Sequence, residues 1–101
     1  MAISFDYNAT IRQSEQMRQI ALEMRRIADS DMSAAIQNIK ANWKGISSDN
    51  FCRKFDLLRS KITQESQSIA QAADTLARLA QSIKEAEERA EREIAERKAK
   101  M

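Results

Sequence analysis

Hydrophobic side chains recur at steps of three and four residues along almost the whole chain, from about residue 8 to residue 90. This is the spacing of one face of an α-helix. The pattern is broken once, where the only tryptophan and the only glycine of 101 residues stand two apart. We therefore predict two long helices, at about residues 8–41 and 49–98, joined by a turn at 43–48.

The two predicted helices differ in how their apolar positions are arranged. In the first, they cover an arc approaching half of the circumference, which is wider than contact with a single neighbouring helix requires. In the second, they follow a 4-3 alternation, which specifies a left-handed supercoil of packed helices. The residues predicted to pack in the hairpin or in a dimer are Ile20, Met24, Ile27, Phe51, Phe55, Leu58, Ile62, Ile69, Leu76, Leu79 and Ile83.

Two features beside this alternation each have two interpretations. Glu65 interrupts the apolar positions of the second helix. It either pairs with an arginine of a neighbouring helix and sets the register, or lies at the rim with its carboxylate in water. A row of alanines (Ala70, Ala73, Ala77 and Ala80) is either a second contact surface that admits a close neighbour or simply good helix-forming sequence.

The ends of the helices carry recognisable signals. Asp6 or Asn8 can cap the first helix, because a short side-chain oxygen accepts from an unpaired amide of the first turn. Gly45 is predicted to end that helix in a left-handed conformation, and the Ser-Ser-Asp-Asn run at 47–50 to cap the second. Trp43 is predicted to seal the end of the hairpin.

Residues 84–101 are almost entirely charged residues and alanine. Acid-first pairs four residues apart stabilise a helix in water without burying a face. We predict a charged helical extension that projects beyond the hairpin. The pairs are Glu85 with Arg89, Glu88 with Arg92, Glu93 with Arg97, and Glu96 with Lys100.

A single hairpin buries one face of each helix, so part of this apolar surface would stay in water. A long exposed apolar patch usually marks a binding partner. The predicted fold class is therefore all-α: one domain, residues 1–101, forms an antiparallel hairpin of two long helices that pairs as a dimer into a four-helix bundle.

Composition narrows the function classes. One glycine and no proline argue against a sheet protein, which would need several tight turns. The net charge of +2 is spread along the chain, so we expect no nucleic-acid partner. No apolar run approaches the ~18 residues of a membrane span, and the first residues do not form a secretory signal. Cys52, the only cysteine, is interpreted as a structural thiol rather than an intermolecular bridge.

Candidate chemistry is absent from the sequence. It contains no histidine, no glycine-rich phosphate loop and no cysteine–histidine metal spacing. We therefore predict no catalytic, cofactor-binding or metal-binding residues, and a protein that is not an enzyme.

The Trp43-Lys44-Gly45 turn between two long helices resembles the WXG family of small type VII secretion substrates, relatives of the mycobacterial early secreted antigen. The resemblance covers the first helix, the turn and most of the second helix. It implies a homodimer or a heterodimer with another WXG-like protein. It also implies export of the folded protein from the bacterial cytoplasm through a type VII ATPase, to the outside or the cell surface. Trp43 and Gly45 would then form part of the export signal.

Many secreted members also carry Tyr-x-x-x-Asp/Glu after the second helix, whereas the only tyrosine here is Tyr7. Either the charged tail works differently, or a partner such as the helical targeting domain of an LXG-type toxin carries the signal. A role in virulence or interbacterial competition would follow. The alternative function is a cytoplasmic coiled-coil adaptor or structural protein with no part in secretion.

Overall fold

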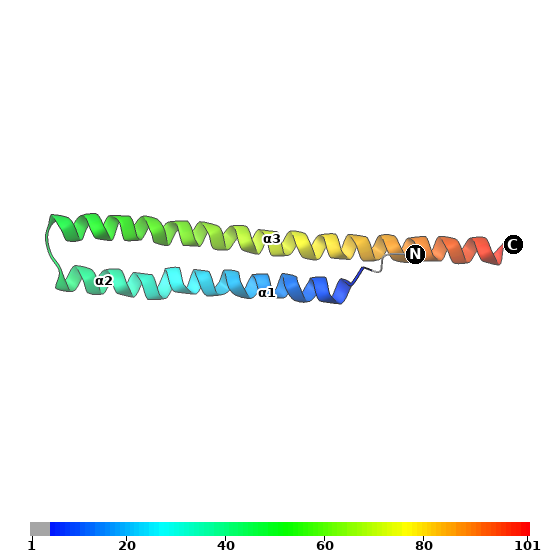
Figure 1. The fold of residues 1–101 in the computed structure, drawn as a ribbon, viewed down its shortest axis with the longest axis horizontal. Coiled ribbons are helices and arrows are strands. Elements are labelled where there is room, and N and C mark those ends of the chain that lie inside the picture. The colour runs from blue at the N-terminus through cyan, green and yellow to red at the C-terminus, as the bar shows by residue number, and fades with distance from the viewer. Residues whose placement is uncertain (1–4) are drawn as a thin grey trace.

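The computed structural model describes residues 5–101, and its regular structure is entirely helical: α1 (Tyr7–Arg26), η1 (Ile27–Met32), α2 (Ser33–Asn42) and α3 (Ile46–Ala99). The first three elements form one rod, here called the first arm, which runs antiparallel to α3 (Figure 1). The molecule measures 85 × 19 × 16 Å. The prediction of an all-helical hairpin is confirmed for this part of the chain.

The first arm begins close to the predicted residue. The Asp6 carboxylate accepts a hydrogen bond of 2.9 Å from the backbone N–H of Ala9, so Asp6 is the cap. The arm ends at Asn42, where Trp43 turns to an extended conformation. Neither boundary departs from the sequence prediction by more than one residue.

The interior of the first arm differs from the prediction, which had an uninterrupted α-helix there. Residues Ile27–Met32 form a π-helical segment, a wider turn that holds an extra residue. Arg26 and Asp31, five residues apart, form an ion pair of 3.4 Å across it. The segment also leaves Ala28 and Met32, four residues apart, both buried against α3.

The two arms meet along small side chains. Serine and alanine recur every seven residues on both sides of this seam, and all six residues are buried: Ser14, Ala21, Ala28, Ser66, Ala73 and Ala80. The Ser14 hydroxyl donates a hydrogen bond of 3.1 Å to the carbonyl of Ala73. Side chains this short allow the helix backbones to approach closely. Ala73 and Ala80 of the alanine row therefore form a close helix contact, as the first interpretation of the row expected, and the neighbour is the first arm of the same chain.

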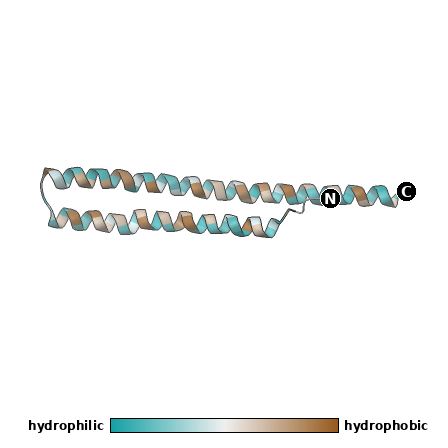
Figure 2. Ribbon diagram, in the orientation of Figure 1, coloured by the Kyte–Doolittle hydropathy of each residue, from teal (hydrophilic) through white to brown (hydrophobic). Residues whose placement is uncertain are grey.

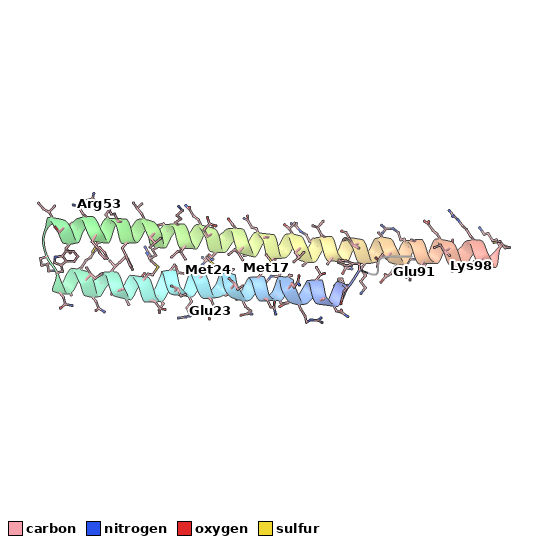
Figure 3. All side chains as sticks on the ribbon, in the orientation of Figure 1. Met17, Glu23, Met24, Arg53, Glu91 and Lys98 are labelled. Atoms are coloured by element: carbon pink, nitrogen blue, oxygen red, sulfur yellow. The ribbon has the colours of Figure 1, made fainter. Side chains whose placement is uncertain are left out.

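Nearer the turn, larger side chains fill the seam. Met32 and Ile36 of the first arm and Cys52 of α3 are buried, and Phe55 is half-buried. The Cys52 thiol is buried in the seam, which agrees with a structural cysteine. Figure 3 shows Met17 and Met24 between the two rods, whereas Glu23 and Arg53 point outward.

At the open end of the hairpin, α3 extends well beyond the start of the first arm. The Tyr7 hydroxyl donates to the Gln81 side-chain oxygen at 3.0 Å, and the Lys84 ammonium lies 4.5 Å from the centre of the Tyr7 ring. Beyond this point α3 continues alone to Ala99 with every residue exposed. The ion pairs found within residues 5–101 include none of the four predicted tail pairs. Within the same residues, no helix is long and apolar enough to cross a membrane.

Candidate interaction surface

The turn consists of Trp43, Lys44 and Gly45 alone. It is shorter than the predicted turn at 43–48, and α3 begins at Ile46 rather than at about residue 49. Gly45 adopts φ +121° and ψ 179°, a conformation essentially reserved for glycine. It is the N-cap of α3, so the predicted left-handed C-cap of the first helix is wrong. A Cβ at this position would meet nothing within 4 Å, and the need for glycine therefore lies in the backbone.

The residues predicted to cap α3 lie inside its first turns instead. The Ser48 hydroxyl donates a hydrogen bond of 2.7 Å to the Trp43 carbonyl and is buried. The backbone N–H of Asp49 bonds to the Gly45 carbonyl at 3.0 Å. These two contacts, one on each side of Lys44, tie the turn to the start of α3.

An aromatic row continues from the turn along α3. The Trp43 and Phe51 ring centres lie 5.9 Å apart with planes tilted by 49°, and Phe51 and Phe55 lie 5.9 Å apart at 22°. Such offset contacts add to the stabilisation from burial. Trp43 is nevertheless 44% exposed, so its ring covers Phe51 and also faces solvent. The predicted seal at the end of the hairpin is only partial.

Large apolar side chains gather on one side of the seam. In both arms each of these side chains stands one residue before or three residues after a position of the seven-residue seam repeat. This places it about 60–100° around the helix from the seam. Because the arms are antiparallel, the same rotation from the seam leads to the same side of the hairpin. We call this side the apolar face. It consists of Met17, Ile20, Met24, Ile27, Phe51, Phe55, Leu58, Ile62, Ile69, Leu76, Leu79 and Ile83.

The hairpin buries none of the eleven side chains predicted to pack. Ile20, Leu58 and Leu79 are 53%, 51% and 55% exposed. Ile27, Phe51 and Ile83 are also exposed, and the other five are half-buried. Apolar residues recur along both rods in Figure 2. The side chains predicted to pack in the hairpin or in a dimer therefore line a surface that the hairpin leaves at least partly open.

The opposite side of the seam carries charged side chains around a groove with apolar walls. Arg18 and Asp74 form an ion pair of 2.6 Å across the two arms, and together with Arg25 and Gln67 they surround a shallow groove of about 240 Å³. The hydrogen bond and the charge of Asp74 raise the pKa of Arg18. Both side chains are largely in water, so the pair contributes little to stability. The hairpin thus has one side of large apolar side chains and one side on which charged residues surround smaller apolar surface, including the exposed Leu22.

In α3 the residues of the apolar face follow alternating steps of three and four residues. Glu65 is the one charged residue at a position of this repeat. It is exposed and takes no part in the ion pairs found among residues 5–101, which agrees with a carboxylate in water. No group of three potential metal ligands occurs in the same residues. The arrangement offers a surface for another helix.

Comparison with protein-family models, with curated proteins and with solved structures gave no match. The seam residues Ser14, Ala21 and Ala28 were not among the residues predicted to pack. Their seven-residue spacing, repeated at Ser66, Ala73 and Ala80, is the signal that could have identified them.

Proposed function

We propose that this chain is a small helical protein of type VII secretion, similar to the WXG family, which pairs with a second helical hairpin and is exported folded. The observation that carries the proposal is the turn: Trp43-Lys44-Gly45 forms the whole break between two antiparallel helices. Trp43 is partly exposed there, so export machinery can reach the ring. The protein would act by binding, without catalysis or a cofactor.

The apolar face supports the pairing. In a four-helix bundle each helix contacts two neighbours that lie roughly at right angles around it. Here each arm already has one neighbour along the small-residue seam, and its large apolar side chains stand 60–100° away. A second hairpin laid on this face, either another copy or a WXG-like relative, would cover it and complete a bundle.

Export requires further partners. We propose that a type VII ATPase recognises the turn together with the charged extension, residues 84–101. Since this extension has no Tyr-x-x-x-Asp/Glu, a cargo such as the targeting domain of an LXG-type toxin would supply the missing signal. The final location would be outside the cell or at its surface.

The test is secretion of the full chain by a bacterium with an intact type VII ATPase and by the matching deletion strain. We expect export only in the former. Trp43→Ala should reduce export strongly, and should cost less than the ~3 kcal/mol typical of a buried aromatic ring because the ring is half in water. Leu57→Ala is the control, since Leu57 is an exposed apolar residue outside the apolar face.

Two results would contradict this function. Export that persists without the ATPase would exclude the type VII route. A chain that stays in the cytoplasm of both strains, with and without a candidate cargo, would favour the coiled-coil adaptor instead.

A further inference from the structure

The apolar face has a defined length along α3. The contact between Tyr7 and Gln81 marks the open end of the hairpin, and Ile46 marks the turn end. The middle of this span lies between Thr63 and Gln64. If two copies pack antiparallel with their hairpin ends aligned, a twofold axis passes through this point, and residues equally far from it on the two α3 helices meet.

This alignment brings apolar positions of one copy onto apolar positions of the other. The seven-residue repeat has two core positions. In an antiparallel coiled coil, each core layer pairs a residue at one of them with a residue at the other on the partner helix, so only one of every seven possible alignments fits. The alignment set by the hairpin ends is one that fits. Its four central layers are Phe51 with Leu76, Phe55 with Ala72, Leu58 with Ile69, and Ile62 with Glu65, and beyond them Leu79 and Ile83 reach the turn end of the other copy, level with Ser48 and Lys44.

Glu65 lies in the layer nearest the axis, and the residue that meets it there is Ile62 of the other copy. Lys61 stands one turn before Glu65 on the outer edge of the same face, and both side chains are exposed. In the aligned antiparallel pair, Lys61 of each copy reaches the level of Glu65 of the other. The carboxylate, which has no ion-pair partner within residues 5–101, would then gain one across the interface.

A parallel pair of copies gives Glu65 no such partner. In that arrangement α3 packs on the first arm of the other copy, and Glu65 lies level with Leu22 and Glu23, so that Ile20 and Met24 are the nearest residues of the apolar face. Arg18 and Arg25 line the groove and face away from the apolar face, and Arg26 is already paired with Glu23 and Asp31. A charge left against methionine and isoleucine costs free energy because it loses water without gaining a counter-charge.

We propose that the apolar face binds a second copy of this chain in the antiparallel sense, and that two reciprocal Lys61–Glu65 ion pairs around the twofold axis fix the register. This rests on the four-helix pairing of the proposed function and specifies its partner and orientation. The interface is self-complementary, since each copy contributes the same lysine and the same glutamate.

Charge reversal tests the pairs. Lys61→Glu places four carboxylates around the axis and Glu65→Lys places four ammonium groups there, so each variant should weaken the homodimer by about tenfold or more. An equimolar mixture of the two variants should form a heterodimer in preference to either homodimer, and the double variant Lys61→Glu/Glu65→Lys should dimerise like the unchanged chain. Sedimentation equilibrium and native mass spectrometry measure these outcomes, and circular dichroism confirms helicity.

Lys54→Glu is the matched control. Lys54 lies one seven-residue repeat before Lys61 on the same edge, but in the aligned pair it meets Ala72 and Thr75, so its reversal should change dimerisation little. A homodimer unaffected by the Lys61 and Glu65 reversals, or a statistical mixture of the two variants, would overturn the proposed register.

Orientation has its own measurement. A spin label at Ser47→Cys, in a Cys52→Ser background, should give a distance of roughly 50 Å between copies in the antiparallel pair. A distance near the bundle width would show a parallel pair and overturn the proposal. An unchanged chain and variants that all remain monomeric at high micromolar concentration would instead contradict the four-helix pairing itself.

Discussion

The two halves of the hairpin hold their helices together in different ways. Toward the open end, the seam consists of alanine and serine, and a hydroxyl of one arm bonds to the backbone of the other. Toward the turn, it consists of Met32, Ile36 and Cys52, with aromatic rings beside them. The small seam leaves no room for large side chains, so these lie outside it. Close packing within one chain therefore creates the surface available for the next.

The open-end seam should be the more sensitive half to added volume. Ala73 is fully buried, so Ala73→Leu would force the helices apart and lower the free energy of unfolding by about 3 kcal/mol. The same change at the exposed Ala95 in the tail should have almost no effect. Urea unfolding followed by circular dichroism measures both. Equal stability of the two variants would show that the arms are not in close contact at Ala73.

The turn end should be sensitive to backbone conformation instead. Gly45→Ala should cost about 2 kcal/mol, because φ is +121° and a side chain gains no contact that offsets the strain. Lys44→Ala, one residue away, should be nearly neutral. Thermal unfolding of both variants tests this. An unchanged melting temperature for Gly45→Ala would mean that the chain closes by another turn.

The smallest effect is expected at the hydrogen bond of the open-end seam. Ser14→Ala should cost about 1 kcal/mol, since the Ala73 carbonyl loses the hydroxyl that reaches it across the seam. Ser68→Ala is the control, because that exposed hydroxyl bonds within its own helix to Gln64. Hydrogen exchange at amides around Ala73 should be faster in Ser14→Ala only. Faster exchange in both variants would point to a general loss of helix.

The difference between the two halves also explains which features of the fold could be predicted from the sequence. The helices and the position of the break follow from periodicity and from the single glycine, so these were predictable. The seam was predictable only in part, because the alanines beside the apolar alternation from Phe51 to Ile83 fit both a contact surface and ordinary helix-forming sequence. Hydrophobicity alone does not distinguish a contact within the chain from a contact with a partner.

The turn shows a second limit. The run at 47–50 contains good capping residues, but Gly45 starts α3 two residues earlier, and Ser48 uses its hydroxyl to hold Trp43. Propensity identifies residues able to cap a helix, whereas the backbone geometry of the turn decides which one does. No local sequence pattern predicts the π-helical segment either.

That segment acts as a phase shift in the repeat. Seven residues beyond Ala28 stands Ala35, but the extra residue of Ile27–Met32 moves the next seam position to Ile36, and seven residues further is Trp43. The one extra residue thus places Ile36 rather than Ala35 in the seam. It also places the Trp43 indole at the end of the seam, beside Phe51. If the same residues formed an uninterrupted α-helix there, the seam would run through Ala35 to Asn42, and the turn would lose its aromatic lid with no change in sequence.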